Sequence, residues 1–205
     1  MNSQKAIISV VITTKNEEKN IEQCLLSVKK QTYPQNRIEV IVVDNNSIDN
    51  TKKNALKHTP YVFNHGPERS AQRNFGAEKS HGSYYLYLDA DMTLSETLIE
   101  QCVDAFEKQP RLAGLYIPEI VTGNTFWVRV RRFEREFYNA TSIDCVRFVK
   151  LSDFKKVGGF DETMSGPEDW DFDKKIRKIG KVSIIRAQLY HNEGEINVDN
   201  YVAKL

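Results

Sequence analysis

Asp89 and Asp91 stand two residues apart directly after the hydrophobic run Tyr84–Leu88. The run predicts a buried strand, and carboxylates at its end can bind a divalent cation together with a diphosphate that the cation bridges. Such a site suits Mg²⁺ or Mn²⁺. An Asp-x-Asp pair by itself is weak evidence, because a capping or solvated acidic turn has the same residues. Its place after a buried strand favours the metal site.

Glu168 and Asp169 form a second acidic pair, at the predicted start of a helix that continues as WDFDKKIRKIG. Carboxylates in the first turn of a helix are stabilised by the helix dipole, and an ionised aspartate in a pocket can act as a general base. The loop before the pair contains Gly158, Gly159 and Gly166, which allow a substrate to approach closely. The alternative is that the pair only stabilises the helix N-terminus.

Basic side chains could serve the same site. Arg69 and Arg73 lie one helical turn apart in ERSAQRNFGA, so both could neutralise a diphosphate, and a solvated helix face is the alternative. His191 follows the stretch Val182–Tyr190. It could complete a mixed Asp/His metal site with the two-carboxylate turn, although a lone histidine is more often structural or exposed.

Asp44 ends another apolar run, Ile38–Val43. A carboxylate at this place can accept hydrogen bonds from a ribose hydroxyl or from a base N–H group. The alternative is a helix N-cap, which is the role that we expect for Asp49.

Alternating strands and helices would bring these groups together. The run Ala6–Thr14 predicts a strand buried on both faces, and a helix follows because apolar residues recur at helical spacing from Ile21 to Val28. We expect Asn16 to cap this helix. Repeated strand–helix units form parallel sheets that bind ligands beyond the carboxyl ends of their strands. The polar clusters at those predicted ends are Thr13–Asn16, Asp44–Asn46 and Asp89–Asp91.

The pattern changes after Pro110, where we expect an acceptor-side half to begin. Its predicted elements are a strand over Gly114–Val121, a helix over Thr125–Asn139 and a strand over Ile143–Val149. Apolar residues also recur at helical spacing from Val198 to Leu205. No repeat or low-complexity linker separates the halves, so we expect one domain over residues 1–205.

Composition narrows the function classes. With 29 basic and 28 acidic side chains the formal charge is +1, which gives no attraction to nucleic acid. The chain has three cysteines, and an odd number set among apolar residues favours a reduced, cytoplasmic protein. The N-terminus has no basic and apolar leader, and no run approaches the roughly 18 apolar residues of a membrane span. We therefore expect a chain that is neither secreted nor membrane-spanning by itself.

Four segments in register resemble the family-2 glycosyltransferases: VVITTKNEE, VVDNNSIDNT, YYLYLDADM, and GGFDE followed by EDWDFDKKIRKIG. The resemblance covers about residues 6–193. It implies an α/β GT-A domain with a mostly parallel, Rossmann-like sheet flanked by helices and a smaller acceptor-side lobe. It further implies a nucleotide-binding half over about residues 1–110, an acceptor-side half over about residues 111–205, a divalent metal (Mn²⁺ or Mg²⁺), and inversion at the anomeric carbon.

The resemblance also implies roles for single residues. Asp169 matches the catalytic base of the family's Glu-Asp pair, and Asp91 and His191 match metal ligands. The positions that match the nucleotide-sugar site are Thr13, Glu17, Asp44, Arg73, Asp89 and Glu168. The family's common Asp-Asp after the second strand is Asp44-Asn45 here, so a role for a second carboxylate is lost. No QxxRW-type motif of processive synthases follows residue 169, which favours transfer of a single sugar.

The expected partners are a UDP-, GDP- or dTDP-linked sugar donor and a glycan or lipid-linked acceptor. The segment Thr125–Tyr138 interleaves aromatic residues with four arginines, a pattern that could contact an anionic membrane surface. The alternative is a half-buried helix with a solvated face, because Glu134 and Glu136 dilute the positive charge.

Two other function classes fit the segments less well. A non-catalytic sugar-nucleotide-binding regulatory module would not need a general base such as Asp169. A nucleotidyltransferase would need a glycine-rich phosphate loop near the first strand, and Thr13–Glu17 contains no glycine.

Overall fold

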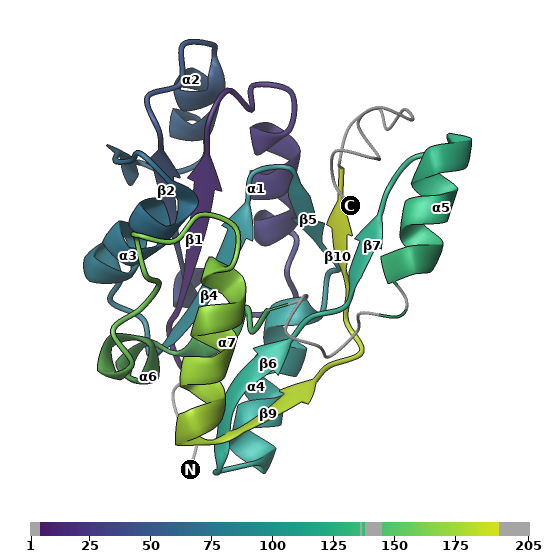
Figure 1. Cartoon of the computed structure of the whole chain (residues 1–205). Helices are drawn as coiled ribbons and strands as arrows, with labels where there is room; N and C mark the ends of the chain where they lie inside the picture. Colours follow the sequence, from purple (N-terminus) through teal and green to yellow (C-terminus); the bar gives the residue numbers. More distant parts are fainter. Residues whose placement is uncertain (1–4, 136, 138–144, 193–205) are drawn as a thin grey trace.

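The computed structural model describes residues 5–135, 137 and 145–192. Within these residues the strands form a seven-stranded sheet of order β3-β2-β1-β4-β8-β6-β9 and a three-stranded sheet of order β5-β10-β7 (Figure 1). The strands are β1 Ile8–Thr14, β2 Ile38–Asp44, β3 Val62–Asn64, β4 Tyr84–Asp89, β5 Met92–Leu94, β6 Leu112–Tyr116, β7 Glu119–Val121, β8 Phe148–Lys150, β9 Lys181–Ile184 and β10 Leu189–His191.

The helices alternate with the strands along most of the chain. They are α1 Ile21–Lys29, the 3-10 helix η1 Gln35–Arg37, α2 Thr51–Leu56, α3 Arg69–Lys79, α4 Leu98–Lys108, α5 Phe126–Arg135, α6 Leu151–Lys156 and α7 Glu168–Ile179. None of these helices is long and apolar enough to cross a bilayer.

The large sheet is mostly parallel, as the sequence predicts. Strand β1 is buried along its whole length and pairs in parallel with β2 on one side and β4 on the other. Strand β8 runs antiparallel to both β4 and β6. The register sets Thr13 of β1 beside Asp89 of β4, so the polar ends of these two strands meet.

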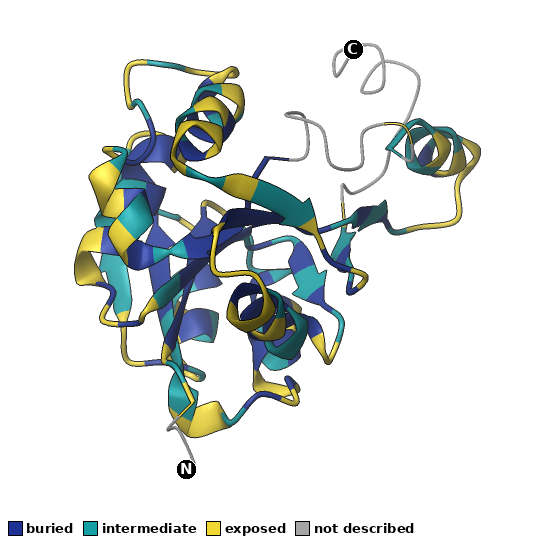
Figure 2. Cartoon of the chain, turned by 90° about the horizontal axis from the view of Figure 1, so that it is seen from below, coloured by how far each residue is buried: buried dark blue, intermediate teal, exposed yellow. Residues whose placement is uncertain are grey.

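Helices cover both faces of the large sheet. On one face, Ile8, Val10 and Ile12 pack with apolar residues of α1 and α4. On the other face, Val11 packs in a cluster with apolar residues of α3, α6 and α7. Helix α3 lies very close to β1, because a Cβ atom at Gly76 would come within 2.3 Å of Val11 Cγ1. Figure 2 shows the buried strands between helices whose outer faces are exposed.

Two sequence-based expectations about elements are wrong. Gly114–Val121 is not one strand, since β6 ends at Tyr116 and β7 begins at Glu119 in the other sheet. Pro118 between them has no N–H group to continue a ladder. Asn16 does not cap α1, which begins at Ile21. Asn16 has a φ of 55°, and its Oδ1 accepts a hydrogen bond from Ile48 N.

The other predicted elements are partly or wholly confirmed. The helix expected over residues 125–139 is α5, which ends at Arg135, and the strand expected over 143–149 is β8, which is shorter. Residues 138–144 and 198–205 lie outside the described part of the chain. The three cysteines are free and buried.

Candidate functional site

A pocket of about 240 Å³ lies at the carboxyl ends of β1 and β4. Its lining includes most of the polar groups that the sequence predicts for a site, because the parallel strands end at the same edge. The residues that line it are Thr13, Thr14, Lys15, Glu17, Arg69, Gln72, Asp89, Ala90, Asp91 and His191.

Asp89 lies among hydrogen-bond donors and cations. Its Oδ1 accepts a hydrogen bond from Thr13 Oγ1 at 2.9 Å and lies 3.3 Å from Arg73 Nη2. Its Oδ2 lies 3.9 Å from Arg147 Nη1. Burial would raise the pKa of Asp89, but the charges of Arg73 and Arg147 outweigh burial and hold that pKa well below its usual value. Asp89 is therefore a fixed negative charge at the base of the pocket.

Arg73 joins the two acidic segments. It is only 1% exposed, and its Nη1 lies 2.8 Å from Asp169 Oδ1 while its Nη2 contacts Asp89. Its guanidinium lies 4.6 Å from the ring centre of Tyr87 and 5.0 Å from that of Phe160. Burial alone would lower the pKa of Arg73, but the two carboxylates raise it above its usual value. The solvated alternative for Arg73 is wrong, because α3 packs this residue inward.

Glu168 and Asp169 begin α7, as the sequence predicts. Glu168 is 3% exposed and accepts a hydrogen bond from Gly166 N at 2.5 Å. Gly166 has a φ of +106°, which a residue with a Cβ rarely adopts. Arg69 Nη2, in turn, lies 3.5 Å from Glu168 Oε1. Asp169 is more accessible, with its side chain 27% exposed.

Asp91 lies directly before β5 and meets His191, the last residue of β10, where these two strands pair. His191 Nε2 lies 3.1 Å from Asp91 Oδ2, and His191 Nδ1 lies 2.6 Å from Glu119 Oε1. Burial alone would lower the pKa of His191, but the hydrogen bonds with Asp91 and Glu119 raise it to about 10. The structure thus brings together the two residues that the sequence suggests as metal ligands.

A continuous chain of alternating charges links the two ends of the site. Arg147 Nη2 lies 3.3 Å from Glu119 Oε2, and Arg135 also pairs with Glu119. Glu119 is 6% exposed. Burial would raise its pKa, but His191, Arg147 and Arg135 lower it below its usual value. The charges run in the order Asp169, Arg73, Asp89, Arg147, Glu119, His191, Asp91.

Glu17 also lies in the pocket, whereas Asp44 does not. Glu17 Oε2 accepts a hydrogen bond from Asn20 Nδ2 at 2.7 Å, and burial, partly offset by this bond, raises the pKa of Glu17. Asp44 is completely buried and accepts hydrogen bonds from the backbone N–H and the hydroxyl of Ser47. The structure therefore shows Asp44 holding the turn after β2, and its binding role stays a prediction.

Sequence reasoning missed Arg147, Glu119 and Gln72. Gln72 Nε2 donates hydrogen bonds to Thr14 O at 3.0 Å and Val43 O at 2.6 Å, so it ties α3 to the ends of two strands. Glu119 begins the short strand β7 and Arg147 stands directly before the short strand β8, with no motif around either residue. The sequence has one signal for Arg147, which is that a charged side chain stands inside an otherwise apolar stretch.

Solved structures show the class of fold. The chain superposes on a crystal structure of Staphylococcus aureus TarS in complex with UDP-GlcNAc with a TM-score of 0.75 and 20% identity, covering 93% of this chain and 60% of that one. The mannosyltransferase PcManGT from Pyrobaculum calidifontis, in complex with GDP-Man and Mn²⁺, gives a TM-score of 0.74 and 21% identity, covering 98% of this chain and 60% of that one. The fold is that of the GT-A glycosyltransferases.

The profile described as Glycosyl transferase family 2 matches residues 9–159. More than half of the chain matches, so the chain belongs to this family of transferases, as its motifs predict. A curated relative, the glycosyltransferase AglE of Haloferax volcanii, is 37% identical over 110 residues, which cover 50% of this chain and 36% of AglE. The chain thus spans only part of the length of such relatives.

Proposed function

We propose that this chain transfers a single sugar from a nucleoside diphosphate sugar to a hydroxyl group of a glycan acceptor, with inversion at the anomeric carbon. The observation that carries the proposal is the pairing of Arg73 with both Asp169 and Asp89. It sets a partly exposed carboxylate beside the pocket at the end of β4. That is where a base must lie if the pocket holds the donor.

Asp169 is the proposed general base. Its carboxylate takes the proton of the acceptor hydroxyl while that oxygen attacks the anomeric carbon, and the bond from this carbon to the diphosphate oxygen breaks with its electron pair on the leaving group. The ion pair with Arg73 fixes the orientation of the carboxylate. Arg69, which lines the pocket, stabilises the negative charge on the leaving diphosphate.

The donor is proposed to bind along the edge formed by β1 and β4. Thr13, Glu17 and Asp89 line this pocket directly. The other three proposed donor-site residues do not line this pocket and act through their neighbours. Arg73 orients Asp89, Asp44 holds the turn after β2, and Glu168 pairs with Arg69. We assign this donor site mainly to a nucleotide-binding half over about residues 1–110, and about residues 111–205 form an acceptor-side half that completes the acceptor site together with residues of the first half.

Asp91 and His191 are the proposed ligands of Mn²⁺ or Mg²⁺. In the described part of the chain, Asp91 Oδ1 is buried without a hydrogen-bond partner, and its other oxygen faces His191 Nε2. A carboxylate oxygen and an imidazole nitrogen that lie 3.1 Å apart can both bind such a cation once the imidazole has lost its proton. The described residues hold no group of three or more acidic, histidine or cysteine ligands, so diphosphate oxygens and water would complete the coordination. When bound, the metal supplies positive charge to the diphosphate. The Mn²⁺ and GDP-Man in the PcManGT complex support a divalent cation as part of the proposal.

A lipid-linked acceptor at the inner face of the membrane is part of the proposal, with α5 as the contact. The exposed face of α5 and the turn after it carry Phe126, Phe133 and Phe137, which are 68%, 63% and 68% exposed.

The arginines of α5 contribute less to such a surface than the sequence suggests. Arg132 donates to Val121 O and Gly123 O, and Arg131 and Arg135 pair with acidic side chains. The aromatic rings, assisted by the exposed Arg129, are the proposed membrane-contacting groups.

Membrane contact is tested by co-sedimentation with vesicles of phosphatidylcholine and phosphatidylglycerol. We expect Phe133→Ser combined with Phe137→Ser to abolish binding, and Arg129→Ala to weaken it at low salt but to have little effect at high salt, where the charge of Arg129 is screened. Leu56→Ser, at an equally solvent-accessible position (56% exposed) on α2, is the matched control. Binding that survives the double substitution contradicts this part of the proposal.

Thermal stabilisation by a panel of UDP-, GDP- and dTDP-sugars, with and without Mn²⁺ or Mg²⁺, tests the function itself. A ligand that binds only the folded state raises the melting temperature. We expect one nucleotide class to stabilise the protein, and only with metal present. The same donor should then yield free nucleoside diphosphate by slow hydrolysis. The absence of any shift across the panel contradicts the proposed function.

A further inference from the structure

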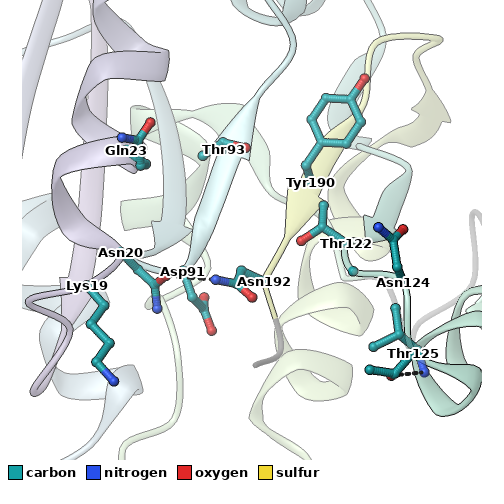
Figure 3. Close-up of a pocket in the computed structure, with 12 residues that line it drawn as sticks. Lys19, Asn20, Gln23, Asp91, Thr93, Thr122, Asn124, Thr125, Tyr190 and Asn192 are labelled. Carbon is teal, nitrogen blue, oxygen red and sulfur yellow. Dashed lines mark hydrogen bonds between the residues drawn. The ribbon is translucent and has the colours of Figure 1, made fainter. Parts of the chain in front are cut away.

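A second pocket, of about 600 Å³, shares Asp91 with the first in its lining. Figure 3 shows Asn20, directly before α1, and Gln23 of α1 on one side of it and Thr122 and Asn124, which lie before α5, on the other. Thr93 of β5 and Tyr190 of β10 stand between these walls. Its volume falls within the roughly 300–1,000 Å³ of small-molecule sites, and the described site residues other than Asp91 do not use it.

The walls are rich in uncharged hydrogen-bonding groups. Side-chain amides come from Asn20, Gln23, Asn124 and Asn192, and hydroxyls come from three threonines and Tyr190. Amides and hydroxyls both donate and accept hydrogen bonds, so they match the hydroxyl groups of a sugar. Among the described residues that line the pocket there is one cation, Lys19, and one carboxylate, Asp91, whereas a phosphate or carboxylate ligand would need an excess of cations.

The pocket also offers an aromatic surface. The ring of Tyr190 projects from β10 along one side of the pocket in Figure 3. An aromatic ring can pack against the C–H face of a sugar while the surrounding amides bind the hydroxyl groups. Val128 is the one aliphatic side chain in the described lining, so the pocket is poorly suited to a purely apolar ligand.

The two pockets share a wall. Asn192 N donates to Asp91 O at 2.9 Å, and Asn192 Nδ2 donates to Asn20 Oδ1 at 2.9 Å. Asn20 in turn donates to Glu17 in the first pocket. A ligand in the second pocket therefore contacts the same few residues that border the proposed donor site. Asp169 does not line the second pocket, so the reacting hydroxyl itself does not sit there.

We propose that the pocket between α1 and α5 is a subsite for a neutral saccharide, the part of the acceptor glycan that lies away from the reacting hydroxyl. This inference rests on the proposed glycosyltransferase function and specifies its acceptor as polyhydroxylated and uncharged at this position. The subsite holds the acceptor next to Asp91, and the free end of the glycan reaches toward Asp169.

Saturation-transfer difference NMR on the whole chain, without donor, tests the subsite. The probes are chitobiose, mannobiose and lactose, with glucuronic acid and inorganic phosphate as charged comparisons. We expect at least one neutral disaccharide to bind and both charged probes to fail. Gln23→Leu and Tyr190→Ala should each weaken that binding at least tenfold. Gln23 is exposed, so its replacement leaves the fold intact.

Tyr61→Ala, at an exposed tyrosine directly before the edge strand β3 that does not line the pocket, is the control and should bind as the unmodified chain does. The subsite is wrong if no neutral disaccharide binds, if a charged probe binds better, or if both pocket variants bind normally. Donor-dependent stabilisation is measured separately on the same variants and should stay unchanged. Loss of saccharide binding therefore remains distinguishable from failure of the proposed donor chemistry.

Discussion

Arg73 Nη1 lies 2.8 Å from Asp169 Oδ1, so a buried guanidinium of α3 holds the first turn of α7 beside the end of β4. The same side chain reaches Asp89 through its other terminal nitrogen. One arginine thus sets the spacing between the proposed base and the proposed donor pocket. The planar fork of a guanidinium presents a separate terminal nitrogen to each carboxylate at a fixed angle, whereas an ammonium group has only one nitrogen for both.

Replacement of the proposed base is the first prediction. Asp169→Asn keeps the size and polarity of the side chain but cannot accept the proton, so kcat should fall by about 10²–10⁴-fold. Donor-dependent thermal stabilisation should remain. Asp171→Asn is the matched control, because Asp171 lies in the same turn of α7 and pairs with Lys175 instead. Transfer at the normal rate by Asp169→Asn would remove Asp169 from the reaction.

Loss of the bridging arginine should affect stability as well as transfer. Arg73→Met leaves Asp89 and Asp169 without their shared cation, and breaking a buried ion pair from one side costs about 3–5 kcal/mol. Urea denaturation measures this change in the free energy of unfolding. Arg69→Met is the control, since the Arg69 side chain is 56% exposed and its pair with Glu168 is long, at 3.5 Å, so its replacement should change stability by about 1 kcal/mol or less. Equal stability of the two variants would contradict the structural role of Arg73.

Removal of the proposed metal-binding carboxylate, Asp91, should abolish the metal-dependent part of donor binding. With Asp91→Ala, the donor that stabilises the unmodified chain in the presence of Mn²⁺ should no longer do so at the same metal concentration. EDTA added to the unmodified chain should have the same effect. Asp104→Ala, at a half-exposed carboxylate of α4, should respond to donor and metal normally. Donor stabilisation that is indifferent both to Asp91→Ala and to EDTA would rule out a metal-dependent donor site.

The sequence predicts the parallel core well because its signals are local. Strand β1 reads as a continuous apolar run, Asp89 directly ends another, and the acidic start of α7 follows a glycine-containing loop. The partners of these residues could not be predicted, since they come from distant segments. Nothing near Glu119 shows that it will face His191, 72 positions away. Likewise, the burial of Arg73 depends on the close packing of α3 at Gly76.

At Asp44 the sequence predicts the position of the carboxylate but not its role. Its place after β2 has the pattern of a ligand-binding carboxylate, but the nearby Ser47 donates two hydrogen bonds to it. The sequence leaves both interpretations open because both need an acidic residue at the end of a strand. Only the three-dimensional course of the loop decides which groups remain for a ligand.

Glu119 is expected to act on the metal site through His191. A carboxylate that accepts the Nδ1–H of a histidine fixes the ring so that Nε2 faces the metal, and losing such a partner typically costs 10–100-fold in metal affinity. Glu119→Gln retains a hydrogen-bond acceptor but loses the charge. We expect the apparent Kd for Mn²⁺, measured by electron paramagnetic resonance with the stabilising nucleoside diphosphate present, to rise by about tenfold or more.

A merely structural role for Glu119 predicts a different pattern. Glu119 also pairs with Arg135 of α5, so it could serve mainly to hold that helix. Arg135→Gln removes this contact and leaves the 2.6 Å contact between Glu119 and His191 in place. If positioning of His191 is the role, Mn²⁺ affinity should fall in Glu119→Gln and stay nearly unchanged in Arg135→Gln, with circular dichroism showing both variants folded. Equal losses of Mn²⁺ affinity in the two variants would assign Glu119 to the anchoring of α5 instead.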